Sequence, residues 1–194
     1  MNHLFAFCGP IGSGKSSVSK LFATKHGATW SGFGATVREI ALERGLATDR
    51  GSLQCLGATL VKNEAGTFCR RVIALTARAS DKPAVIDGLR HIAILQELRH
   101  ILNPRKVVCI YVDAPLTIRL ERVKKRDGLS PDQLARLEMH STEVEVEHRL
   151  KGIADFVVDN QKSVAECVDS IMDWMQRSGL SFDFRQTGQV SGNQ

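Results

Sequence analysis

The chain has 194 residues, of which 43% are hydrophobic and 24% are charged, with a net charge of +5. This length suits one domain, and the hydrophobic content excludes a disordered chain because it supplies apolar surface for one sizeable core. The positive charge would suit an anionic partner, but it is spread along helices, so it fits phosphorylated small molecules as well as nucleic acid.

Short apolar runs alternate with helical patterns along most of the chain. The runs at 3–8, 84–86, 107–112 and 156–158 are predicted strands. The predicted helices are 15–25, 37–43, 53–63, 68–79, 92–102, 116–125, 131–150 and 163–175. Strands that alternate with helices imply an α/β fold with a parallel sheet. We therefore expect one domain over residues 1–178, followed by a loose polar tail over 179–194.

The strongest motif lies between the first predicted strand and the first predicted helix. It satisfies GxxxxGK[ST] and runs Gly9, Pro10, Ile11, Gly12, Ser13, Gly14, Lys15, Ser16. In that context the glycines let backbone N–H groups turn towards a phosphate, and the helix adds its positive end. Lys15 would reach the β and γ oxygens of ATP and Ser16 would bind Mg²⁺, with Ser17 completing the expected ATP-binding set.

This motif does not distinguish kinases from other P-loop proteins, so the class of P-loop protein has to be inferred from other segments. The segment from Val85 to Arg90 reads Val-Ile-Asp-Gly-Leu-Arg. It resembles the Asp-Gly-X-Arg element of archaeal nucleotide kinase-like proteins, which is one residue longer in adenylate kinases. The resemblance implies that Asp87 lies beside the phosphate loop and holds Mg²⁺ through water, and that Arg90 grips the acceptor's phosphate. A carboxylate at the carboxyl end of a strand and an arginine fork are chemically suited to these roles.

A third segment, from Gly34 to Arg38, resembles the Gly-Asp-X-X-Arg stretch of nucleoside monophosphate kinases. The resemblance implies that Arg38 reaches the acceptor's phosphate from the start of a helix. Ala35 stands where that family has aspartate, so the substrate identity does not carry over with the motif.

The helix expected after residues 107–112 carries Arg119, Arg122 and Arg126, in the order that nucleotide kinases use before their lid. Arg122 and Arg126 are four residues apart and share one helical face, so both could reach the same anion. The resemblance implies that these two are catalytic lid arginines, which stabilise the charge on the transferred group. The loop that follows is brief, which predicts a short helical lid.

The segment from Ala154 to Asn160 resembles the end of dephospho-CoA kinases and related proteins. With this segment, the resemblance to P-loop nucleotide kinases extends from about His3 to Met175. It implies a three-layer P-loop NTPase fold, in which a five-stranded parallel sheet is flanked by helices.

The five cysteines, Cys8, Cys55, Cys69, Cys109 and Cys167, show neither a CxxC pair nor a zinc spacing and are expected to be reduced core thiols. No run approaches the roughly 20 apolar residues of a membrane span, and the first apolar run is too short for a signal peptide. We expect a soluble, cytoplasmic protein with no membrane partner; its oligomeric state stays open.

The resulting hypothesis is a kinase that uses ATP and Mg²⁺ to phosphorylate a small phosphate-bearing acceptor, with a nucleoside or deoxynucleoside monophosphate favoured. Dephospho-CoA is an alternative acceptor, for which Asp87 could also serve as a base. An alternative of another class is a P-loop ATPase or a nucleotide-gated DNA-binding module, including a kinase of modified DNA bases. Nucleic acid is disfavoured but stays open, since aromatic residues are few and no nucleic-acid motif is present.

Overall fold

A computed structural model of the chain describes residues 3–76, 83–128, 130, 132–133 and 146–180. Its described strands form one parallel sheet in the order β2-β3-β1-β4-β5. Their bounds are β1 Leu4–Cys8, β2 Thr29–Gly32, β3 Ala84–Leu89, β4 Val107–Asp113 and β5 Phe156–Asp159. The central strand β1 pairs with β3 on one side and β4 on the other, which places Leu4 opposite both Ala84 and Val107. The expected five-stranded parallel sheet is therefore confirmed.

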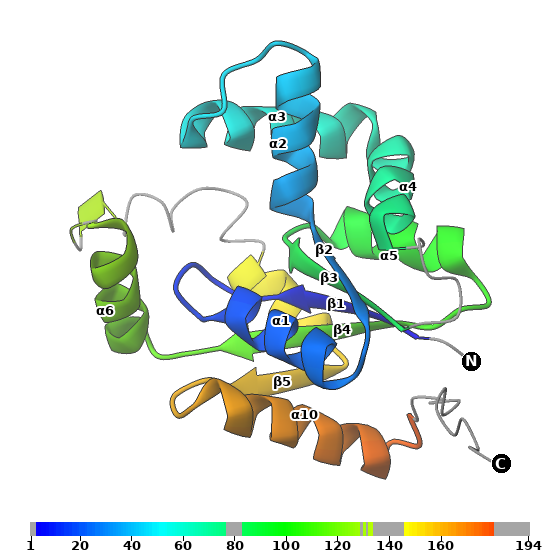
Figure 1. Cartoon of the computed structure of the whole chain (residues 1–194), viewed down its shortest axis with the longest axis vertical. Coiled ribbons are helices and arrows are strands. Elements are labelled where there is room, and N and C mark those ends of the chain that lie inside the picture. The colour runs from blue at the N-terminus through cyan, green and yellow to red at the C-terminus, as the bar shows by residue number, and fades with distance from the viewer. Residues whose placement is uncertain (1–2, 77–82, 129, 131, 134–145, 181–194) are drawn as a thin grey trace, which may run out of the picture.

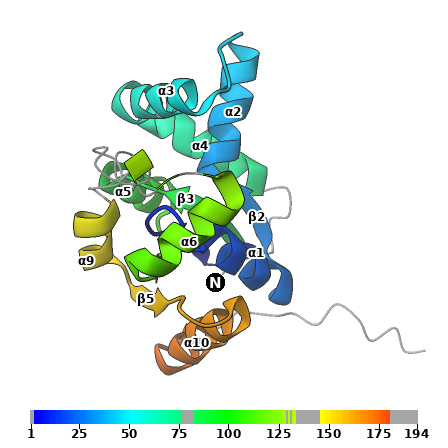
Figure 2. The same ribbon diagram turned by 90° about the vertical axis from the view of Figure 1, so that its left-hand side faces the viewer.

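Helices cover both faces of this sheet (Figure 1). The described helices are α1 Lys15–Lys25, α2 Phe33–Glu43, α3 Arg50–Asn63, α4 Ala65–Thr76, α5 Ile92–Leu102, α6 Leu116–Asp127, η1 Val146–Leu150, α9 Lys151–Ile153 and α10 Val164–Arg177. Helices α1 and α10 pack together on one face, and α4 and α5 pack on the other. Helices α2 and α3 extend from the sheet as an arm, and Figure 2 shows α6 on the side where the β1–α1 loop lies.

The alternation of side chains along β1 explains why both faces need helices. Leu4, Ala6 and Cys8 enter the core beneath α4 and α5, whereas Phe5 and Phe7 enter the core beneath α1 and α10. All five are fully buried. A parallel strand that is covered on both faces has this continuous apolar sequence, and the result is the expected three-layer fold.

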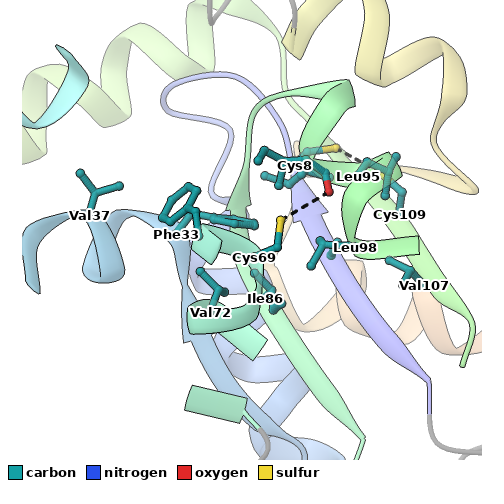
Figure 3. Close-up of a cluster of buried hydrophobic side chains, with 14 of the residues drawn as sticks. Cys8, Phe33, Val37, Cys69, Val72, Ile86, Leu95, Leu98, Val107 and Cys109 are labelled. Carbon is teal, nitrogen blue, oxygen red and sulfur yellow. Dashed lines mark hydrogen bonds between the residues drawn. The ribbon is translucent and has the colours of Figure 1, made fainter. Parts of the chain in front are cut away.

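Cysteine thiols contribute to the first of these cores (Figure 3). The Sγ atoms of Cys8 and Cys109 lie 3.7 Å apart, and the Cys69 thiol donates to the Ile94 carbonyl at 4.0 Å. Burial raises the pKa of Cys69 to about 12. Cys8, Cys69, Cys109 and Cys167 are buried as predicted, but the prediction is wrong for Cys55, which is exposed on α3.

Several element boundaries differ from those predicted. Strand β2 was not predicted, because Thr29–Gly32 has few apolar residues and forms the sheet edge. Helices α2, α3 and α4 begin three or four residues earlier than expected. Most of the helix predicted at 131–150, and with it the lid, lies outside the described residues, as does the tail from residue 181. In the described part of the chain, no helix combines the length and hydropathy of a membrane span.

We predict that Leu98→Ala lowers the free energy of unfolding by about 2 to 5 kcal/mol, because it removes a fully buried side chain of α5 and leaves a cavity. Leu42→Ala is the matched control, since Leu42 is 65% exposed near the end of α2. Urea unfolding of both variants measures the difference. Equal losses of stability would contradict the assigned packing of α5.

Candidate active site

The β1–α1 loop leaves the carboxyl end of the central strand and turns back over it into α1. Gly12 and Gly14 have φ values of 80° and 85°, which side chains rarely adopt. A Cβ on Gly12 would also lie 2.7 Å from the Arg119 carbonyl oxygen of α6. Both positions therefore require glycine, for conformation and for the close approach of a neighbouring helix. The turn is closed by the Ser13 N–H, which donates to the Pro10 carbonyl at 3.2 Å.

Lys15 is the first residue of α1 and is partly buried within this loop. Its Nζ lies 3.5 Å from the Pro10 carbonyl oxygen. Burial, followed by the positive charges of Arg90 and Arg126, lowers the pKa of Lys15 from 10.5 to about 7, although Asp87 and Cys8 act in the opposite direction. A bound polyphosphate would add negative charge here and favour the ammonium form.

Ser16 and Asp87 meet between α1 and β3, where the Ser16 hydroxyl donates to Asp87 Oδ2 at 2.6 Å. The other oxygen, Asp87 Oδ1, is buried and has no hydrogen-bond partner among the described residues. Hard oxygen ligands of this kind fit Mg²⁺, which takes few protein ligands and completes its shell with water and phosphate. No group of three or more His, Cys, Asp or Glu side chains gathers as a metal cage in the described ranges.

A cavity of about 610 Å³ opens beside the loop, between the sheet edge and the α2–α3 arm. Predicted site residues from the β1–α1 loop, α1, α2, β3, the turn after β3 and α6 line it: Ile11, Gly12, Lys15, Ser16, Arg38, Asp87, Arg90 and Arg126. Arg90 is partly buried, and burial lowers its pKa. Arg38 is exposed in the second turn of α2, not at the helix start as expected, because α2 begins at Phe33.

Two further polar residues of the cavity were missed by the sequence analysis. Arg50 and Gln54 lie in the first turns of α3 and line the same space. The apolar part of the lining comes from the arm, through Val37, Leu53 and Val61, and from α4 and α5, through Phe68 and Ile94. Arg50 and Gln54 are four residues apart, so their spacing alone predicts that they share one face of a helix. Nothing local, however, indicates that this face meets the loop.

At the end of α6, Asp127 holds two of the cavity's arginines. It accepts from Arg126 Nε at 2.7 Å and from Nη2 at 2.6 Å, and it lies 4.0 Å from Arg50. This bidentate pairing raises the pKa of Arg126 and lowers the pKa of Asp127. An aspartate carboxylate thus occupies the fork of an arginine that could equally receive a phosphate.

The remaining predicted residues lie around the outside of the loop. Arg122 is not part of the cavity lining among the described residues; its guanidinium donates to the Ser13 carbonyl at 3.2 Å. Ser17 is exposed, and its N–H donates to the Gly14 carbonyl at 3.0 Å. Asn160, for which no role was predicted, also reaches the loop and donates to the Ser13 carbonyl at 2.7 Å.

A family model described as an AAA domain matches residues 6–146, which include the loop, the cavity lining and most of the sheet. The chain belongs to this family. It is 35% identical over 122 residues to a cytidylate kinase from Desulfurococcus amylolyticus, a match that spans 63% of this chain and 60% of that protein. It is 28% identical over 185 residues to a UPF0200 protein from Methanocaldococcus jannaschii, spanning 89% of each chain.

Solved structures agree with this AAA-domain assignment at the level of the fold. The APS kinase of Mycobacterium tuberculosis superposes with a TM-score of 0.62 at 18% identity, covering 90% of this chain and 98% of that one. The expected membership in the P-loop kinase superfamily is confirmed, and so is the predicted fold class. At this identity the likeness concerns the fold and leaves the substrate open.

We predict that this AAA-domain protein takes up a proton when it binds MgADP at about pH 8, but not at about pH 6. With its pKa lowered to about 7, Lys15 is mostly neutral at the higher pH, and the nucleotide's negative charge restores the proton. At the lower pH the ammonium form already exists, so no proton is needed. Calorimetric titrations in buffers of different ionisation enthalpy measure the uptake.

Lys15→Arg is the control for this proton uptake, because arginine stays charged throughout the range. Its titrations should show no uptake at either pH. Equal uptake at both pH values in the unaltered protein, or persistence of the uptake in Lys15→Arg, would contradict the assignment to Lys15.

Proposed function

We propose that the protein transfers the γ-phosphoryl group of ATP to a nucleoside monophosphate. The observation that carries the proposal is the cavity of about 610 Å³, in which Lys15 of the phosphate loop and the arginines of a separate arm line one space. Arg38, Arg50 and Arg90 suit an acceptor's phosphate, because guanidinium forks bind phosphate oxygens in pairs. The apolar residues of the arm and the Gln54 amide suit the face and the edge of a base.

In this proposal the chain's own groups align and neutralise the reacting phosphates. The loop's N–H groups and Lys15 hold the β and γ phosphates, and Arg90 holds the acceptor's phosphate on the other side of the reacting phosphorus. Ser16 and Asp87 would hold Mg²⁺, which when bound would neutralise negative charge on the phosphates. Arg126 is the lid arginine best placed to help, since it already lines the cavity. Phosphoryl transfer of this kind depends on positioning and electrostatics.

Two considerations favour a monophosphate over a hydroxyl acceptor. A phosphate oxygen is already ionised and needs no general base, whereas a hydroxyl would need one. The similar proteins also include cytidylate kinases from Desulfurococcus amylolyticus and Aeropyrum pernix, the latter 31% identical over 121 residues. The matches span about 60% of those enzymes' lengths, so the acceptor is part of the proposal. Such an enzyme would act in the cytoplasm, with residues 1–178 as its kinase domain.

A coupled assay of ADP release tests the proposal directly. We expect MgATP turnover to depend on one or more ribo- or deoxyribonucleoside monophosphates, with the cytidine nucleotides tested first. Lys15→Ala should lower the rate by at least about a hundredfold, because it removes the loop's cation. Turnover with dephospho-CoA and with no monophosphate would show that dephospho-CoA is the acceptor. Turnover that needs no acceptor and is stimulated by DNA would show that the protein is a DNA-dependent ATPase and not a kinase.

For Arg90→Ala we expect the acceptor's KM to rise by about ten- to a hundredfold, the effect of one lost charged hydrogen bond or a bidentate pair. The KM for MgATP should change much less, because the loop's own contacts remain. Arg44→Ala is the matched control, since Arg44 pairs with Glu64 on the exposed end of α2. Steady-state kinetics with each substrate varied in turn separates the two constants. Equal rises in both would place Arg90 outside the acceptor's site.

A further inference from the structure

The Ser13 carbonyl points out of the phosphate loop and is held there by two donors from distant parts of the chain. Asn160 Nδ2 donates to it at 2.7 Å from the end of β5, and Arg122 Nη1 donates to it at 3.2 Å from α6. Arg122 Nη2 also donates to the Asn160 carbonyl at 2.9 Å. Three hydrogen bonds therefore join Ser13, Asn160 and Arg122 to one another, so the two donors are also fixed relative to each other.

Fixing this carbonyl also fixes the direction of the next backbone N–H. The peptide bond between Ser13 and Gly14 is planar and trans, so its C=O and N–H point in opposite directions. With the Ser13 oxygen held outward, the Gly14 N–H is directed to the concave side of the loop, where a phosphate would lie. Gly14 has φ 85° and ψ 13°. Because glycine adopts positive and negative φ values about equally readily, its own backbone does not select this direction, and contacts from outside the loop are needed to fix it.

The Asn160 side chain is itself fixed in the orientation that this contact needs. It is 1% exposed, and the Cys167 thiol donates to its Oδ1 at 3.3 Å, which leaves the Nδ2 group facing Ser13. The contact with the loop is close: a Cβ on Gly14 would lie 2.3 Å from Asn160 Nδ2. A buried amide whose donor and acceptor sides are both used can take only one orientation.

We propose that Asn160, together with Arg122, is a positioning residue that aims the Gly14 N–H at a phosphate of the bound nucleotide. Asn160 acts through the loop's backbone and does not touch the reacting atoms. The inference rests on nucleotide binding by the phosphate loop, which is part of the proposed function, but it does not depend on the identity of the acceptor.

The test is a titration with MgADP, without any acceptor, of the unaltered protein and of Asn160→Asp. The aspartate keeps the size and the oxygen that faces Cys167, but it puts a second acceptor against the Ser13 carbonyl. We expect the Kd for MgADP to rise about tenfold or more. In ¹H–¹⁵N spectra, the downfield shift of the Gly14 amide on binding should appear in the unaltered protein and be lost in the variant at saturation.

Asn160→Ser is the second variant and keeps the proposal testable if the buried aspartate prevents folding. It removes the amide donor without adding charge, and the same weaker binding and loss of the Gly14 shift are expected. Asn63→Ala, at the exposed end of α3, is the control and should bind MgADP like the unaltered protein. A folded Asn160 variant that binds as tightly, or that keeps the full Gly14 shift when saturated, would overturn the proposal, even if its stability is lower.

These outcomes are distinct from those that test the acceptor. If no monophosphate is phosphorylated but the Asn160 variants still lose the Gly14 shift with MgADP, the proposed acceptor is wrong and the positioning role stands. If a monophosphate is phosphorylated and the Gly14 shift is unchanged in the Asn160 variants, the proposed acceptor is right and the positioning role is wrong.

Discussion

The central position of β1 is the constraint on which the rest of the molecule depends. Because β1 pairs with β3 and with β4 in parallel, the carboxyl ends of these three strands lie at one edge of the sheet. The phosphate loop follows β1, Asp87 lies in β3, and α6 follows β4. One hydrogen-bonding arrangement in the core thus brings together a loop, a carboxylate and a basic helix that are separated by up to about a hundred residues. The site is a consequence of strand order.

Electrostatic balance at this edge explains several contacts that would otherwise look unrelated. Lys15, Arg90 and Arg126 crowd positive charge around one cavity, and this crowding contributes to the lowered pKa of Lys15. Asp87 offsets part of that charge beside Lys15, and Asp127 offsets part of it beside Arg126. An excess of cations of this kind destabilises the empty protein locally and is relieved by an anion. The same arrangement therefore opposes tight local packing and favours phosphate binding.

The sequence predicted those parts of the site that lie within one continuous motif. The loop from Gly9 to Ser16 could be located because its chemistry depends on neighbouring residues and on the strand and helix beside it. Asp87 could be located because it directly follows the apolar run at 84–86 that was predicted as a buried strand, although β3 extends through it to Leu89. Arg50, Gln54 and Asn160 could not, because what brings them to the loop is the docking of an arm or the end of β5, which no local pattern encodes. Strand β2 was missed for a related reason: its place at the sheet edge comes from pairing with β3.

The spacing of the arginines on α6 predicts that they share a face of the helix, but it does not predict which partners they contact. Arg119, Arg122 and Arg126 share a face, as their spacing predicts. A rise of about 1.5 Å per residue nevertheless separates the first from the last by about 10 Å along the axis, so they meet different partners. Arg119 and Arg122 donate to the Ile11 and Ser13 carbonyls, alternate carbonyls of the loop, whereas Arg126 reaches the cavity. Within the described residues, one basic face thus divides into a part that shapes the phosphate loop and a part that is available to a ligand.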